Sequence, residues 1–236
     1  MITLIKKSDY TDKHMIHKFY EWFHSLVSKP DERREYSSGY WPDKIRNYVV
    51  RMCRASEGKL LEFGCGEGLF LINLKKVNPV LHVWGVDKWD EILERAKTLL
   101  EKEKVKDIRL ISIKDDRLAF EDAFFDTVVC INVFYNMSSL HKVEIAAREM
   151  VRVLKSGGSL IAEFKNRLNP FVFLKYKCAR YYDATIKKQN LPLTTFTIKE
   201  MARLFQTLGC PIKKNIFLGF PHNRFAPIVI LEAIKR

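Results

Sequence analysis

The chain has 236 residues, of which 47% are apolar and 29% charged, and its formal net charge is +13. It is long and apolar enough to fold around a core. Its apolar runs are too short to span a bilayer, and its start lacks the apolar core of a signal peptide. Its five cysteines include no CxxC pair. We therefore expect a reduced, cytoplasmic protein without a transmembrane segment, a disulfide framework or a metal site.

Strand and helix signals alternate through the middle of the chain. Short apolar runs rich in branched side chains predict strands over residues 59–63, 81–86, 108–113, 126–133 and 159–164. Apolar positions at helical spacing predict helices over residues 69–76, 89–102 and 140–154, the last of which should end at the glycine-containing turn 155–158. This alternation is typical of a parallel sheet with helices on both faces.

The rhythm changes after residue 164. Thr197 with Glu200 three residues later has the pattern of a helix-capping pair and predicts a helix that ends near Gly209. Two further strands, over 212–218 and 227–234, would pair as a closing antiparallel ribbon. We expect one domain made of four parts. N-terminal cap helices occupy residues 1–57 and a cofactor-binding core occupies residues 58–164. A substrate cap follows over residues 165–196, and a closing helix with two strands over residues 197–236.

The most informative segment is EFGCGEG at residues 62–68, which follows the first strand and opens a helix. Glycines at this point let the backbone turn sharply and approach a ligand closely. Their spacing is GxGxG, whereas a dinucleotide-binding loop has GxGxxG and a Walker loop ends in GK[ST]. The acidic Glu62, two positions before Gly64, favours a ligand with a positive group over a phosphate.

With these residues the sequence resembles the class I S-adenosylmethionine-dependent methyltransferases. The family's first motif is an acidic residue, any residue and GxGxG, and its second is an acidic residue at the end of strand two, which Asp87 matches. The run REMVRVLKSGG at residues 148–158 closely follows the family's RE-x-x-RVLK-x-GG. The resemblance covers about residues 59–164 and is nearest to small-molecule methyltransferases of the ubiquinone-biosynthesis type.

This resemblance implies a fold and a cofactor. The fold is α/β, a doubly wound, seven-stranded, mostly parallel sheet of order 3-2-1-4-5-7-6 with its last strand antiparallel and with a helical cap. The cofactor is S-adenosyl-L-methionine, which leaves as S-adenosyl-L-homocysteine after methyl transfer.

The resemblance also implies roles in binding the ribose and methionine parts of the cofactor. Asp87 would accept hydrogen bonds from the ribose hydroxyls, with capping of the next helix as the alternative. Glu62 would face the methionine ammonium, and Gly64 and Gly66 would let the methionine lie against the backbone. Cys65, between these glycines, is expected to be a small filler, because methyl transfer here needs no thiolate.

The residues expected to contact the adenine follow the family's pattern less closely. Lys88 could flank the ring. The family usually has an acidic residue after strand three, but the alignment places Lys114 there, directly before two aspartates. We predict that Asp115 makes this contact, with Asp116 as the second candidate.

The methyl acceptor is expected at the end of strand four, in residues 132–136 (NVFYN). Asn132 and Tyr135 have the spacing of the [DN]PPY motif of amino-group methyltransferases, but valine and phenylalanine replace its prolines, and we interpret the match as coincidental. We assign Asn132 to the cofactor site and Tyr135 to the acceptor site. Tyr135 and His222, the latter on the loop between the last two strands, are the predicted general bases.

The caps are expected to choose the acceptor. Tyr36, Tyr40 and Trp41 belong to an aromatic loop that could close over the site, with simple packing under the N-terminal helix as the alternative. The segment 166–195 interleaves aromatic and basic residues, which suits an anionic aromatic molecule, RNA, a membrane surface carrying a lipophilic substrate or a solvated lid. We predict methyl transfer to an O, N or C atom of a small anionic or aromatic metabolite. The alternatives are an RNA methyltransferase that uses the basic flanks, and a protein that binds the cofactor without catalysis.

Overall fold

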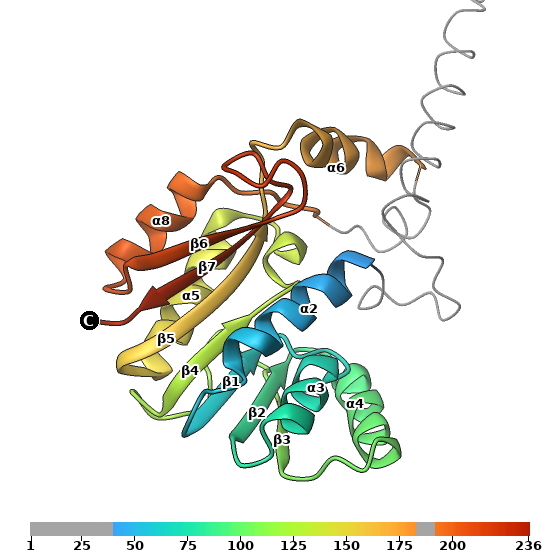
Figure 1. Cartoon of the computed structure of the whole chain (residues 1–236), viewed down its shortest axis with the longest axis vertical. Coiled ribbons are helices and arrows are strands. Elements are labelled where there is room, and N and C mark those ends of the chain that lie inside the picture. Colours follow the sequence, from blue (N-terminus) through green and yellow to red (C-terminus); the bar gives the residue numbers. More distant parts are fainter. Residues whose placement is uncertain (1–39, 183–191) are drawn as a thin grey trace, which may run out of the picture.

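The computed structural model describes residues 40–182 and 192–236, and these contain one seven-stranded sheet (Figure 1). The strands are β1 (Lys59–Phe63), β2 (His82–Asp87), β3 (Ile108–Ser112), β4 (Phe125–Cys130), β5 (Leu154–Lys165), β6 (Ile212–Leu218) and β7 (Ile228–Ile234). Their order is β3-β2-β1-β4-β5-β7-β6. The strands from β3 to β5 pair in parallel, and β7 is antiparallel to both of its neighbours, which confirms the predicted α/β fold.

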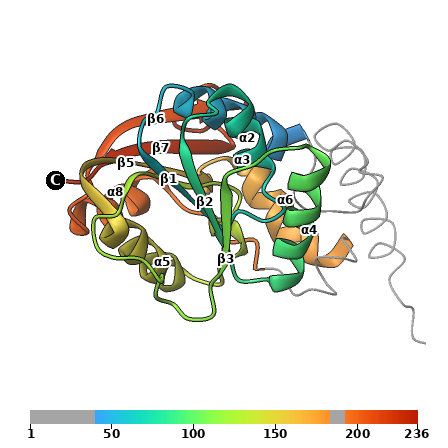
Figure 2. The same cartoon turned by 90° about the horizontal axis from the view of Figure 1, so that it is seen from below.

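Helices cover both faces of the sheet. They are α2 (Tyr40–Cys53), α3 (Leu69–Val77), α4 (Asp90–Lys102), α5 (Leu140–Val153), α6 (Pro170–Tyr182) and α8 (Ile198–Thr207), and a 3-10 helix, η1, spans Phe134–Asn136. Figure 2 shows α2 and α3 on one side of the sheet and α5 and α8 on the other. Within the described ranges, no helix combines the length and apolarity needed to cross a bilayer.

Strand alternation builds the two cores. Successive side chains of a strand point to opposite faces, so Leu61 packs in the core with α5 and α8 while Leu60 packs in the core with α2 and α3. On that second face the same alternation brings Glu62 of β1 and Glu163 of β5 into the interior, and both carboxylates are buried. Buried charge near the carboxyl ends of parallel strands therefore lies on the face of the sheet that α2 and α3 cover.

Two predicted boundaries were wrong. β4 ends at Cys130 and not at residue 133, because Asn132 has a φ of 58° and turns the chain into η1. The turn predicted at residues 155–158 belongs to β5, which begins at Leu154 directly after α5. The reason is tertiary: Gly157 N–H donates to the Lys235 carbonyl at 2.8 Å, and Lys235 N–H donates to the Gly158 carbonyl at 3.1 Å.

The C-terminal elements match the prediction. The Thr197 side chain accepts the Glu200 N–H at 3.2 Å, and Glu200 accepts the Thr197 N–H at 2.7 Å, so the capping box is formed. The helix ends at Thr207, and β6 and β7 form the expected antiparallel ribbon. The loop between β6 and β7 lies beside the start of α6, where Asn169 donates to the Phe225 carbonyl at 2.8 Å (Figure 1).

Candidate active site

The glycine loop after β1 is fastened to the end of β2. The N–H groups of Gly64 and Cys65 both donate to the Val86 carbonyl, at 2.8 and 3.0 Å. Gly64, Gly66 and Gly68 all have positive φ values, of 75°, 52° and 74°. The backbone thus winds past the carboxyl ends of β1 and β2 in a conformation that favours glycine.

Two of these glycines differ in what surrounds them. A Cβ on Gly64 would lie 2.3 Å from Cγ2 of Val133, so Gly64 is needed for the close approach of the loop to the chain after β4. A Cβ on Gly66 would meet nothing nearer than Cγ2 of Ile92 at 4.0 Å. Gly66 therefore borders space that a side chain would fill, as expected where a ligand lies against the backbone.

Asp87 holds the loop from the end of β2. One carboxylate oxygen accepts the Gly66 N–H at 2.9 Å, and the other accepts the Trp89 N–H at 3.2 Å. The side chain is buried, with 9% exposed. Since a carboxylate has about four acceptor positions, Asp87 can accept further hydrogen bonds from ligand hydroxyls while it keeps both backbone contacts.

Glu62 is a buried acid with one unused oxygen. It is 3% exposed, and its Oε2 has no hydrogen-bond partner within the described residues. Burial raises the pKa of Glu62 well above its usual range and nearby Asp87 adds to this, whereas Arg46 on α2 opposes it. A buried oxygen without a partner is costly, so this position suits a ligand that brings a donor, and above all a positively charged one.

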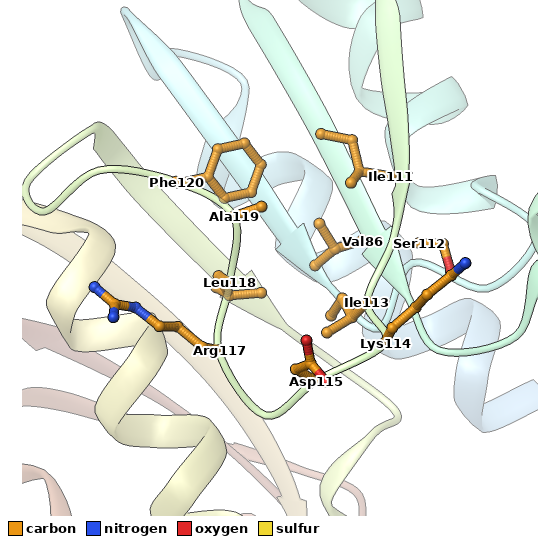
Figure 3. Close-up of a pocket in the computed structure, with 10 residues that line it drawn as sticks. All are labelled: Val86, Ile111, Ser112, Ile113, Lys114, Asp115, Arg117, Leu118, Ala119 and Phe120. Atoms are coloured by element: carbon orange, nitrogen blue, oxygen red, sulfur yellow. The ribbon is translucent and has the colours of Figure 1, made fainter.

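A cavity of about 230 Å³ lies beyond the end of β3. Val86, Ile113 and Leu118 form apolar walls, and Asp115 stands at its border (Figure 3). Asp116 does not line this cavity and instead lies 3.6 Å from the ammonium of Lys88, at the surface. The two aspartates thus face different surroundings, and Asp115 is the one placed to contact a planar group in the cavity.

A polar clamp from α5 holds the wall of this cavity. Arg152 donates to the carbonyls of Leu118 and Phe120, each at 2.9 Å, and to the Asp122 carboxylate at 2.6 Å. Glu149 pairs with Arg152 at 2.8 Å and accepts the Leu118 N–H at 2.8 Å. Glu149 and Arg152, which both belong to the run at residues 148–158, therefore fix the segment after β3.

Polar groups also converge where β4 and β5 end. The N–H of Asn132 donates to Oε2 of Glu163 at 2.9 Å, and Glu163 Oε1 accepts from Lys165 at 2.7 Å. The Lys165 ammonium lies 5.2 Å from the centre of the Tyr135 ring. Oδ1 of Asn132 is buried without a hydrogen-bond partner in the described part of the chain. This end of the sheet thus combines a half-buried phenol with buried charge.

Comparison with known proteins identifies the class. A family model described as "Methyltransferase domain" matches residues 61–162, the stretch that holds the glycine loop, Asp87 and Asn132. The fold is similar to the crystal structure of magnesium protoporphyrin IX methyltransferase from Synechocystis PCC 6803 with bound S-adenosylhomocysteine. That likeness has a TM-score of 0.64 at 17% identity and covers 82% of this chain and 83% of that one. The chain carries a class I S-adenosylmethionine-dependent methyltransferase domain.

Curated relatives of this methyltransferase act on different acceptors by name. Ubiquinone/menaquinone biosynthesis C-methyltransferase UbiE from Pseudomonas putida GB-1 is 27% identical over 171 residues, which are 71% of this chain and 63% of that protein. Probable tRNA methyltransferase 9B from Homo sapiens is 30% identical over 166 residues, which are 66% of this chain and 31% of that protein. The chain spans less than two thirds of the length of either relative. These two relatives therefore do not identify the methyl acceptor of this chain.

The site of the methyltransferase fits S-adenosylmethionine. The unused oxygen of Glu62 matches the ammonium of the methionine part, and the space beside Gly66 leaves room for it against the loop. Asp87 has acceptor positions left for the two ribose hydroxyls. Bound there, the cofactor supplies an electrophilic methyl group on a sulfonium.

The buried Glu62 should make cofactor binding depend on pH. Its raised pKa means that the free methyltransferase holds a proton there above the usual carboxyl range, and an ammonium ligand must displace it. We expect the affinity for S-adenosylhomocysteine to increase with pH through that raised pKa, by up to about tenfold per pH unit.

Calorimetric titration over a series of pH values, from the usual carboxyl range upward, would measure this dependence. Glu62→Gln, which cannot ionise, should bind more weakly and lose this part of the pH dependence. If the variant keeps the affinity and the pH profile of the natural protein, Glu62 does not contact the ammonium.

The remaining residues predicted for the site lie in different surroundings. Cys65 is buried, and burial raises the pKa of its thiol well above the usual value, which fits the expected filler. His222 is exposed on the β6–β7 loop. Trp41 packs on that loop, since a Cβ on Gly219 would lie 2.8 Å from its indole ring. Tyr36 and the side chain of Tyr40 lie outside the described residues.

Sequence reasoning missed three buried charged residues that lie beside the candidate site. Arg46, on α2, is 8% exposed and influences Glu62. Glu163 and Lys165 occupy alternate positions at the end of β5 and are 0% and 7% exposed. The available signal was weak: two charges in the otherwise apolar run SLIAEFK (residues 159–165) read equally well as the exposed end of a strand.

Proposed function

We propose that this methyltransferase transfers the methyl group of S-adenosylmethionine to an O, N or C atom of a small anionic or aromatic metabolite. The observation that carries the proposal is the hydrogen-bonded packing of Thr194 against η1 at the acceptor end of the sheet. Thr194 lies over η1, donating its N–H to the Tyr135 carbonyl at 2.8 Å and its hydroxyl to the Met137 carbonyl at 2.5 Å. A segment held against η1 in this way, beside the half-buried Tyr135, leaves less room for a polynucleotide than for a small molecule.

In this function the protein mainly aligns the reactants. Methyl transfer is an in-line displacement, in which the acceptor atom forms the new bond to carbon while the bond from carbon to sulfur breaks. Asp87 and the backbone at Gly66 would fix the direction of the methyl group, and the half-buried Tyr135 would lie along the acceptor and help to exclude water. Tyr135 is also the candidate to take the proton that an O–H or N–H acceptor loses.

We also propose a cytoplasmic location. All five cysteines are free, and four of them are buried. Free thiols are typical of proteins in a reducing compartment.

An RNA acceptor is the second candidate, and a specific surface favours it. Phe171, Phe173 and Leu174 of α6 are each about half exposed, and Lys177 lies beside Phe173, 5.8 Å from its ring centre. Aromatic and basic side chains of this kind can bind single-stranded nucleic acid. The tRNA methyltransferase among the relatives supports the same reading.

Labelled cofactor separates these possibilities. The protein is incubated with S-adenosylmethionine carrying a labelled methyl group and a fractionated cell extract. We expect nuclease-resistant label in the small-molecule fraction, where mass spectrometry identifies the product. Label in the RNA fraction, lost at higher salt, would replace the small-molecule proposal by the second candidate. Tight cofactor binding with no labelled product in any fraction would indicate a binding protein without catalysis.

A further inference from the structure

A buried ion pair stands beside the proposed acceptor site. Glu163 and Lys165 project from the same face of β5, and Lys165 Nζ donates to Glu163 Oε1 at 2.7 Å. Their side chains are 0% and 9% exposed. Burying two charges costs free energy that their mutual attraction only partly offsets, so such a pair stabilises a fold little unless its remaining hydrogen-bonding positions are filled.

The ammonium of Lys165 is unusual among the shielded lysines of this chain. The buried Lys75 donates to two backbone carbonyl oxygens, at 2.6 and 3.1 Å. The ammonium of Lys235 lies against three backbone carbonyl oxygens, at 2.7, 2.8 and 3.4 Å. An ammonium has three N–H donors, and in the described ranges Lys165 has one acceptor, the Glu163 carboxylate. Two donors of Lys165 therefore have no acceptor within residues 40–182 and 192–236.

These donors lie where an acceptor molecule would be held. The second oxygen of Glu163 accepts the N–H of Asn132, so one carboxylate joins Lys165 to the chain after β4. Asn132 has its own buried oxygen, for which the described part of the chain offers no partner, and the Tyr135 ring lies 5.2 Å from the ammonium. Unfilled donors, an unfilled acceptor and an aromatic face thus meet at one end of the sheet.

The surrounding charge favours an anion. Among residues 166–182, which leave β5 at this end, Lys175 and Lys177 are basic and none is acidic, while the basic Arg167 is paired with Glu200 of α8. The β6–β7 loop beside them adds Arg224 and likewise has no acid. A positive surface of this kind attracts anions. Glu163 already balances the charge of Lys165, and the sulfonium of the bound cofactor would balance that of an incoming anion.

We propose that Lys165 is the residue that selects the methyl acceptor, by donating its two remaining hydrogen bonds to a carboxylate or phosphate oxygen of that molecule. Glu163 is the positioning residue: it orients the ammonium and at the same time fixes the backbone of Asn132. This inference rests on the proposed function and adds to it that the acceptor carries an anionic group near the methylated atom.

The test uses the full chain in four forms: natural protein, Lys165→Met, Lys165→Arg and Lys75→Met. Lys75→Met is the matched control, because it also removes a buried ammonium but lies on α3 and binds only carbonyls. Each form is given methyl-labelled S-adenosylmethionine with the small-molecule extract, and the products are separated by anion exchange. KM and kcat are then measured with the acceptor identified by mass.

We expect the main product to be retained as an anion. Lys165→Met should raise the KM for the acceptor about tenfold or more, the loss expected for a hydrogen bond to a charged group, with unchanged affinity for S-adenosylhomocysteine. Lys165→Arg should keep most of the affinity, and Lys75→Met should leave the KM unchanged. If Lys165→Met does not fold, Lys165→Gln, which can still donate to Glu163 but has no charge, is expected to raise the KM in the same way.

Two results would overturn the proposal while the proposed function stands. One is a labelled small molecule without an anionic group. The other is an acceptor KM for Lys165→Met, or for Lys165→Gln in its place, within about twofold of that of the natural protein, which would mean that water alone fills the two donors. Label found only in RNA would instead refute the proposed function itself, and this inference with it.

Discussion

Gly66→Val should weaken the binding of S-adenosylhomocysteine by about tenfold to a hundredfold, because the new side chain enters the space that the ligand needs, at a cost of about 1–3 kcal/mol. Gly66 has a φ of 52°, and the atom nearest to an added Cβ would be Ile92 Cγ2, at 4.0 Å. The loop can therefore accept the added bulk in the free protein more easily than when the ligand is bound. Calorimetric titration measures the affinity, and circular dichroism checks the fold.

Gly209→Val provides the matched control for backbone strain. Gly209 has a φ of 74° with nothing within 4 Å of an added Cβ, and it follows α8, outside the glycine loop. Both variants should lose stability through the left-handed backbone, and only Gly66→Val should lose affinity. Equal affinities in the two variants would show that the cofactor does not lie against Gly66.

Asp87→Ala should reduce the affinity for S-adenosylhomocysteine by about 1.5–3 kcal/mol, which is the range for hydrogen bonds to a charged group. Two effects add to this loss. The ribose hydroxyls lose their acceptor, and the N–H groups of Gly66 and Trp89 lose the carboxylate that holds the loop against β2. Asp87→Asn keeps one carbonyl acceptor and should fall between the alanine variant and the natural protein.

Asp116→Ala is the control for the Asp87 variants. Asp116 is about half exposed and pairs with Lys88 at 3.6 Å, so its removal should leave the affinity for S-adenosylhomocysteine nearly unchanged. Unaltered affinity in Asp87→Ala, measured by the same titration, would remove Asp87 from the cofactor site. It would leave the carboxylate with only its role in holding the loop.

Much of the architecture could be predicted because its signals are local. The run KLLEF followed by glycines favours a strand that ends in a turn, and Thr197 with Glu200 favours the start of a helix. The sheet order came from the resemblance carried by the glycine loop, Asp87 and the run at 148–158, and the pairing of the strands confirms it. The strand and the helix start depend on neighbours only a few residues apart, whereas the sheet order depended on the resemblance.

The boundaries that were wrong depend on distant partners. Residues 155–158 contain the glycines of a turn, yet they extend β5 because the last residues of the chain supply their hydrogen bonds. The end of β4 depends on Asn132, whose left-handed backbone donates its N–H to Glu163 on the next strand. Neither partner is visible to a local pattern.

The sequence by itself determined the alternating elements, the glycine loop and the acidic residues at the ends of the first two strands, and through them the cofactor. Only the tertiary structure decided which charges are buried together. Glu62 lies near Arg46 of a helix that precedes the core, and Lys165 is bonded to Glu163 with donors left over. A charged side chain has the same pattern in sequence whether it faces water or the interior, because its burial depends on what the folded chain places against it.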